Sequence, residues 1–287
     1  MQIASIPYGG NGEGGCIWCW QPSYGSLCGV TELQTPPVGI ESDDHLLARW
    51  TATVAGQALT ELRTQGLQGR DLKDAGDRTA HELLMRLLAE HRPGDAVLSE
   101  EGKDDKARLT ASRVWIVDPL DGTREYSEPP RDDWAVHVAL WQDGDLVAGA
   151  VAQPGLDTTF STGEPPTVPP SSSPRTRIAV SRTRPPAFVQ ALAEEIDADL
   201  VPMGSAGAKV ISVVRDVTDA YVHAGGQYEW DSAAPVVVAR AAGLHTSRVD
   251  GGPLAYNQDD VLLPDLCVCR PEIAEQITEF VRRYGHE

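Results

Sequence analysis

The segment 114–126, VWIVDPLDGTREY, joins a run of large apolar residues to a pair of aspartates. A short apolar run of this kind predicts a buried strand, and this strand is expected to end at Asp118. Asp118 and Asp121 lie three residues apart, so their carboxylates repel each other at neutral pH. A positive group is therefore expected between them.

Strand and helix patterns alternate from residue 175 to the end of the chain. Apolar runs such as RIAVS and DLCVC predict strands, and segments such as PPAFVQALAEEI and PEIAEQITEFVRRYG predict helices. This alternation is typical of α/β architecture. The first half has long helical segments followed by paired strands, so the predicted fold class is α/β with an α+β N-terminal half.

Capping residues and turns divide the first half into elements. ESDDHLLARW begins a helix that Ser42 or Asp43 can cap, and DRTAHELLMRLLAEH predicts a second helix with Asp77 as its cap. DWAVHVALWQDGDLVAGAVAQP predicts a β-hairpin that turns at Asp143. The loop STGEPPTVPPSSSPRTR marks a boundary. We therefore expect a poorly ordered extension over 1–42, an α+β metal-binding unit over 43–174 and an α/β substrate-binding unit over 175–287.

The charge and hydropathy of the chain limit its partners. A formal net charge of -18 disfavours binding to duplex nucleic acid, since phosphate contacts need clustered Lys and Arg. A small anionic substrate is compatible with this charge if bound cations offset the repulsion. No apolar run reaches the roughly 18–20 residues of a membrane helix, and no signal peptide is recognised. We expect a cytoplasmic location and no membrane partner, and the sequence leaves a homodimer open.

Three of the five cysteines lie near the N-terminus, at Cys16, Cys19 and Cys28. The CIWC segment has the spacing of a metal or redox pair, but it lacks the second half of a zinc set. Reduced thiols are the favoured interpretation, as in most cytosolic proteins.

Acidic residues stand at the ends of several predicted elements: Asp77, Glu100 and Glu101, Asp118 and Asp121, and Asp231. Taken singly, each has an ordinary explanation as a helix cap, a solvated loop or a turn. Taken together, carboxylates that converge on one sheet edge raise each other's pKa or bind cations. Mg²⁺ prefers such oxygen ligands, commonly together with a substrate phosphate.

The turn after Asp121 adds features of an anion site. The Leu120 carbonyl can face the same point as the two aspartates, and the N–H groups of Gly122 and Thr123, expected near a helix start, favour an anion. Cation-binding carboxylates beside an anion-binding turn describe a metal-assisted phosphate site.

These motifs resemble those of the inositol monophosphatase-like superfamily of Mg²⁺-dependent, lithium-sensitive phosphatases. VLSEEG, WIVDPLDGTREY and EWDSAAPVVVARAAG occur in the order and at the separations typical of that family, over about residues 43–287. The resemblance implies a layered α-β-α-β-α sandwich and two or three Mg²⁺ ions that activate a water for in-line attack on phosphorus. It implies metal ligands at Glu100, Asp118, Leu120 (through its carbonyl), Asp121 and Asp231, with Asp77 and Thr123 as catalytic residues.

Within this superfamily, Arg124-Glu125, the AVSRT segment and the strand RDDWAVHVALW resemble the 3'(2'),5'-bisphosphate nucleotidase branch, particularly its actinobacterial members. The implied reaction hydrolyses 3'-phosphoadenosine 5'-phosphate to AMP and phosphate. A Lys or Arg would pair with the phosphate that is not cleaved. The implied substrate contacts are Gly122, Thr123, Ser181, Arg182, Ser205, Lys209 and His223, the last at a position where some relatives carry Arg or an acidic residue.

Other interpretations stay open. The same chemistry on inositol monophosphate, fructose 1,6-bisphosphate or a phosphorylated secondary metabolite is one alternative, and a non-catalytic nucleotide- or metal-binding regulator is a more distant one. Arg182 and Lys209 also fit solvated surface charges. Arg124 and Glu125 fit a structural ion pair, and His137 fits a packed histidine better than a ligand.

Overall fold

The computed structural model of the protein describes residues 35–285. The cysteine-rich segment with Cys16, Cys19 and Cys28 lies outside the described residues, as does most of the predicted extension 1–42. The chain from Pro36 onward forms one compact unit. The predicted division of that unit near residue 174 stays a prediction.

Two five-stranded sheets form the frame of the described part. The first sheet has the strand order β1-β2-β3-β4-β5. Its β1 and β2 are parallel, and the remaining pairs are antiparallel. Its strands are β1 (Ala96–Ser99), β2 (Arg113–Asp121), β3 (Ala135–Gln142), β4 (Asp145–Gln153) and β5 (Thr158–Ser161).

The second sheet is mixed and has the order β7-β6-β8-β10-β9. Here β6 runs parallel to both β7 and β8, and β10 runs antiparallel to β8 and β9. Its strands are β6 (Arg177–Ser181), β7 (Asp199–Met203), β8 (Ala220–Tyr228), β9 (His245–Ser247) and β10 (Leu262–Cys269).

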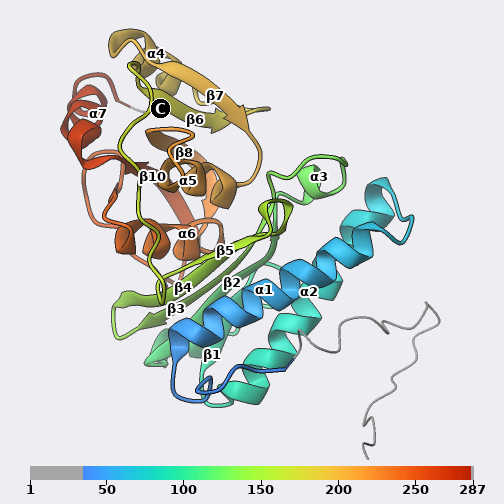
Figure 1. Cartoon of the computed structure of the whole chain (residues 1–287). Helices are drawn as coiled ribbons and strands as arrows, with labels where there is room; N and C mark the ends of the chain where they lie inside the picture. The colour runs from blue at the N-terminus through green and yellow to red at the C-terminus, as the bar shows by residue number, and fades with distance from the viewer. Residues whose placement is uncertain (1–34, 286–287) are drawn as a thin grey trace, which may run out of the picture. The chain divides into compact units, whose positions relative to one another are not determined.

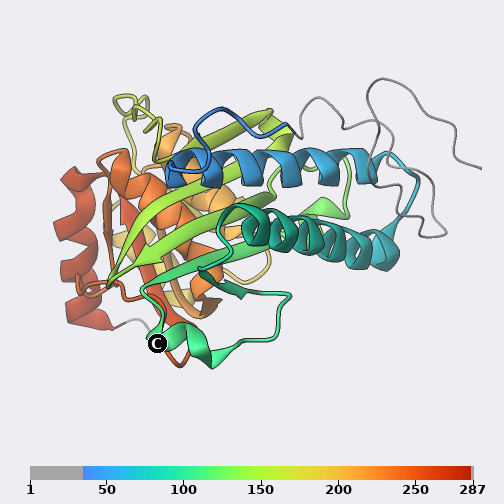
Figure 2. The ribbon, with the colours of Figure 1, turned by 90° about the horizontal axis from the view of Figure 1, so that it is seen from below.

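Helices and sheets alternate in five layers, which confirms the predicted α-β-α-β-α sandwich (Figures 1 and 2). Two long helices cover the outer face of the first sheet, two helices pack between the sheets, and two more cover the second sheet. In that order they are α1 (Asp44–Arg63) and α2 (Gly69–His91), α5 (Ala206–Val214) and α6 (Glu229–Ala241), and α4 (Ala187–Glu195) and α7 (Pro271–Tyr284). None of the described helices is long and apolar enough to cross a bilayer.

The buried strand predicted before Asp118 is the clearest case of sequence directing this packing. Successive side chains of a strand point to opposite faces. Trp115 and Val117 therefore enter the core under α1 and α2, whereas Val114 and Ile116 enter the core that faces α5 and α6. Because both faces of β2 are covered, the apolar run ends where the strand leaves these two cores, at Asp118 and Asp121.

Several local predictions are confirmed and others are wrong. The Asp43 side chain caps α1 by accepting the Leu46 N–H at 3.0 Å, and the hairpin turns at Asp143 with φ 48°. Asp77 is not a helix cap, because α2 begins eight residues earlier at Gly69. The short edge strands β5 and β9 were not predicted.

We predict that two valines of β4 differ in their response to the same truncation. Val151 is fully buried between the sheets, whereas Val147 on the same strand is 41% exposed. Val151→Ala should lower the free energy of unfolding by about 2 kcal/mol through lost burial and a residual cavity. Val147→Ala should change it by less than about 0.5 kcal/mol. Urea denaturation of both variants tests this, and equal losses would contradict the difference in burial between the two side chains.

Candidate metal centre

Three of the predicted metal ligands converge in the structure. Among the described residues, carboxylate oxygens of Asp118, Asp121 and Asp231 all lie within 4.8 Å of one another. Asp118 and Asp121 are buried at the end of β2, and Asp231 is half-buried in the first turn of α6. Residues 110 positions apart in the chain thus share one small region.

A tight turn after β2 aims the first two carboxylates. The Leu120 N–H donates to Asp118 Oδ1 at 3.0 Å, and the strand register shifts between Asp118 and Asp121. Gly122 follows with φ 84°, and a Cβ there would lie 3.1 Å from the Ser205 side chain. Glycine therefore suits both the left-handed backbone and the close approach of α5.

Asp121 is held as an anion by the start of α5. Its carboxylate accepts hydrogen bonds from the Ser205 hydroxyl, from Ala206 N at 3.1 Å and from Gly207 N at 2.6 Å. His137 Nε2 lies 3.2 Å from Asp121 Oδ2. Burial alone would raise the pKa of Asp121, but His137 and the Ser205 hydrogen bond outweigh burial and lower it to about 2.

The neighbouring carboxyl groups have raised pKa values. Burial, followed by the charges of Glu100 and Asp121, raises the pKa of Asp118 well above its usual value. Burial of its carboxyl group and nearby carboxylates raise the pKa of Glu100 to about 7, although the residue as a whole is exposed and hydrogen-bonds to Asp118. Burial and Asp121 raise the pKa of Asp231 to about 6.

This donor set fits a hard divalent cation. Every side-chain group in it offers oxygen, which Mg²⁺ and Ca²⁺ prefer over nitrogen or sulfur. Burial and, after it, the neighbouring carboxylate charges raise these pKa values, and a bound cation would favour the ionised forms. Asp231 Oδ2 also accepts the Tyr228 N–H at 2.6 Å, which fixes the side chain at the start of α6. Asp231 can therefore make the predicted capping contact and still serve as a metal ligand.

Asp77 and Thr123 lie beside this cluster. Thr123 Oγ1 lies 3.1 Å from the Leu120 carbonyl oxygen and 3.4 Å from Asp77 Oδ1. Asp77 lines a cleft of about 290 Å³ together with Glu101 and other residues of α2. Burial and the Glu101 charge raise the pKa of Asp77 to about 6.

Besides Gly122 and Thr123, which follow Asp121 in the chain, two predicted substrate contacts lie next to Asp121. Ser205 is its hydrogen-bond donor, and Lys209 is buried one turn further along α5. Lys209 Nζ donates to the Ser205 carbonyl at 2.7 Å and lies 5.2 Å from the centre of the Tyr221 ring. Burial lowers the pKa of Lys209 despite the attraction of Asp121. The solvated-lysine alternative is therefore wrong.

The other predicted contacts have partners of their own. Arg182 Nε lies 2.7 Å from Glu125 Oε1, and Arg182 Nη2 lies 2.8 Å from Glu128 Oε2. Glu125 thus pairs with Arg182 and not with Arg124. Ser181 Oγ accepts the Arg184 N–H, and His223 Nε2 lies 2.6 Å from the Gly225 carbonyl oxygen. Burial lowers the pKa of His223.

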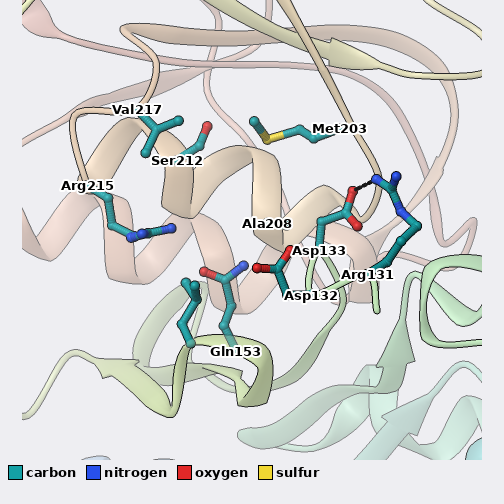
Figure 3. Close-up of a pocket in the computed structure, with 10 residues that line it drawn as sticks. Arg131, Asp132, Asp133, Gln153, Met203, Ala208, Ser212, Arg215 and Val217 are labelled. Carbon is teal, nitrogen blue, oxygen red and sulfur yellow. Dashed lines mark hydrogen bonds and ion pairs between the residues drawn. The ribbon is translucent and has the colours of Figure 1, made fainter. Parts of the chain in front are cut away.

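A separate pocket of about 270 Å³ lies against α5 and the end of β4 (Figure 3). Arg131 and Asp133 form an ion pair at its rim, and Gln153 and Arg215 also line it. Asp118, Asp121 and Asp231 are absent from its lining. The acidic cluster is therefore the candidate reaction site, and this pocket is not.

Sequence reasoning missed the groups that surround Asp121. The backbone N–H groups of Ala206 and Gly207 were not predicted to face it, and His137 was interpreted as a packed histidine. His137 is indeed fully buried, but it also contacts a predicted ligand. No motif in the sequence indicates these contacts. The structure shows that Gly207 has no room for a side chain, because a Cβ there would overlap the His137 ring.

Comparison with known proteins agrees with this geometry. The model of the inositol monophosphatase family matches residues 47–286. The chain is 52% identical over 234 residues, 77% of its length and 86% of the relative's, to the 3'-phosphoadenosine 5'-phosphate phosphatase of Mycobacterium bovis. It is 49% identical over 84% of its length to the protein of that name from Mycobacterium leprae, of which it covers 94%.

A solved structure shows the same fold. The crystal structure of inositol monophosphatase II from Staphylococcus aureus superposes with a TM-score of 0.71 at 22% identity, over 83% of this chain and 95% of that one. The predicted family is confirmed by the domain match, the curated relatives and the layered fold together. The chain belongs to the inositol monophosphatase family.

Proposed function

We propose that the protein is a Mg²⁺-dependent phosphatase that hydrolyses the 3'-phosphate of 3'-phosphoadenosine 5'-phosphate to give AMP and phosphate. The observation that carries this proposal is the convergence of Asp118, Asp121 and Asp231 at one point. The name of relatives about 50% identical over most of the chain supports the choice of substrate.

The metal would be held by the acidic cluster. Asp118, Asp121 and Asp231 supply carboxylate oxygens, and Glu100 and the Leu120 carbonyl are adjacent oxygen donors. Magnesium in such a site supplies Lewis acidity and a water of lowered pKa. These oxygen donors are more numerous than a single Mg²⁺ ion needs from a protein, so the site would hold two or three ions.

Asp77 and Thr123 are suited to orient the attacking water. Thr123 Oγ1 can donate only one proton, and the Leu120 and Asp77 oxygens compete for it. An Asp77 carboxyl with a pKa of about 6 is mostly ionised at neutral pH and can accept a proton there. The half-buried position of Asp77 keeps Oδ1 reachable from the cleft lined by α2.

Arg182 is the better candidate of the two cations for the phosphate that is not cleaved. Lys209 is buried and already donates to two backbone carbonyls. The Arg182 side chain is 24% exposed, and its second carboxylate partner, Glu128, is 46% exposed. Exposed ion pairs are weak, so a phosphate can replace Glu128 at modest cost, while Glu125 holds the guanidinium in place.

Loss of one charge at the centre should abolish turnover. Asp121→Asn keeps the size of the side chain but removes a carboxylate oxygen, and we expect the rate of phosphate release to fall by about 100-fold or more, as for several kcal/mol of lost charge stabilisation. Asp145→Asn, at an exposed ion pair on the hairpin, is the control and should keep wild-type turnover. Full activity of the Asp121 variant would refute the assignment.

The substrate is tested by parallel phosphate-release assays. With Mg²⁺, the ratio kcat/KM for 3'-phosphoadenosine 5'-phosphate should exceed the ratios for inositol 1-phosphate and fructose 1,6-bisphosphate by at least about tenfold, a difference of about 1.4 kcal/mol. Added Li⁺ should inhibit. Arg182→Ala should weaken binding of 3'-phosphoadenosine 5'-phosphate and so reduce the ratio of its kcat/KM to those of the other two esters. Arg49→Ala, which removes an ion pair on α1, is the control and should leave that ratio unchanged. A faster reaction with either competitor would overturn the substrate.

Metal affinity and stability should change with pH in opposite senses. The pKa values of Glu100 (about 7) and Asp231 (about 6) lie above the values of unfolded carboxyls. The folded, metal-free protein therefore binds extra protons between about pH 4 and 7, so its stability rises as pH falls through that window. Calorimetric Mg²⁺ affinity should weaken over the same window because protons compete. An affinity equal at pH 8 and pH 5.5 would contradict this.

A further inference from the structure

One buried side chain contacts two of the three ligand-bearing segments and is paired with the third. His137 lies in β3 with no exposed surface. Its Nε2 lies 3.2 Å from Asp121 Oδ2, and its Nδ1 lies 3.1 Å from the carbonyl oxygen of Trp230, the residue before Asp231. In the β2–β3 ladder, His137 is the direct partner of Asp118.

The first turn of α5 fixes the ring from a fourth direction. The Gly207 N–H donates to the same Asp121 Oδ2 at 2.6 Å. A Cβ on Gly207 would overlap His137 Nε2, so the helix approaches the ring as closely as an amino acid without a side chain allows. The imidazole is therefore confined by β3, α5, the Asp121 turn and the start of α6.

We propose that His137 is a positioning residue that sets the separation of Asp121 from Asp231 and thereby the affinity of the site for Mg²⁺. The inference rests on the proposed metal centre, and it concerns a residue that would not touch the ion. The imidazole ring is rigid and holds Nδ1 and Nε2 at a fixed separation. Asp121 cannot move away from the start of α6 without breaking one of the two ring contacts.

Loss of His137 should weaken Mg²⁺ binding indirectly, because His137 would orient a ligand and not bind the ion. Partners that orient ligating carboxylates typically change metal affinity by about 10–100-fold when removed. A loosened Asp121 would still have the Ser205 hydroxyl and two backbone N–H groups, so the site should weaken without being lost. A residue that only fills space would affect folding stability and leave the affinity of the folded protein unchanged.

The chain offers a matched control. His91 is also a buried histidine whose Nδ1 faces a carboxylate, here Glu41 at 2.9 Å, but it lies at the end of α2 and contacts none of the three ligand segments. His91→Gln and His137→Gln are therefore the same change in two similar environments. Gln can place an amide N–H near the position of the imidazole Nε2.

The test is Mg²⁺ titration by calorimetry on the full chain, with folding checked by circular dichroism. We expect His137→Ala and Gly207→Ala each to weaken Mg²⁺ binding by about 10-fold or more. His137→Gln, which can keep the Asp121 contact but loses the Trp230 contact, should stay weaker than wild type, and His91→Gln should match wild type. Gly207→Ala keeps the His137 side chain but forces its ring to shift, so it tests the proposal even if His137→Ala fails to fold.

Unchanged Mg²⁺ affinity in folded His137→Ala or Gly207→Ala would overturn the proposal, as would a His137→Gln variant that binds Mg²⁺ as tightly as wild type. Turnover of 3'-phosphoadenosine 5'-phosphate by the wild type is measured in parallel. Mg²⁺ binding without turnover would overturn the proposed reaction and leave the positioning role standing. No Mg²⁺ binding by the wild type would overturn both.

Discussion

Repulsion between buried carboxylates is the constraint on which the rest of this structure depends. Two unit charges about 4.8 Å apart, the separation that bounds the oxygens of Asp118, Asp121 and Asp231, repel each other by about 3 kcal/mol at an effective dielectric constant of about 20. The chain stabilises one of these charges itself, at Asp121, with donors from α5 and with His137. At Asp118 and Asp231 it raises the pKa instead. The remaining imbalance is what a divalent cation corrects.

The layered packing is what brings these charges together. Asp118 and Asp121 end a strand of the first sheet, whereas Asp231 and the donors around Asp121 belong to helices packed between the sheets. The geometry of the site therefore depends on how α5 and α6 pack against β2 and β3. Arg182 extends the same connection to the second sheet, because it leaves the end of β6 and pairs with Glu125 in α3 (Thr123–Tyr126). A change in any of these contacts would alter the positions of the carboxylates.

The sequence was most informative where a strong apolar pattern ends in a charged group. The end of β2, expected at Asp118 and observed at Asp121, could be placed within three residues. The start of α6 could be placed within two residues of Asp231. The start of α2 could not, because its buried stripe begins with Leu72 and continues through the small residue Gly76, which packs under Tyr126. Edge strands of three or four residues are too short to show a period.

Contacts between layers were the other part that the sequence did not reveal. His137 and Gly207 are 70 residues apart, and neither stands in a motif that points to the other. Their contact follows from the close approach of α5 to β3, which is a property of the assembled fold. The ion pairs of Arg182 with Glu125 and Glu128 were equally absent from the sequence analysis, because nothing in the AVSRT segment indicates these partners.

The most direct test of the central claim is a crystal of the protein soaked in Mn²⁺, an ion that binds the same oxygen donors as Mg²⁺ and scatters anomalously. The account predicts an anomalous peak in contact with the carboxylates of Asp118, Asp121 and Asp231. A peak located elsewhere, or none at a Mn²⁺ concentration that supports turnover, would contradict it.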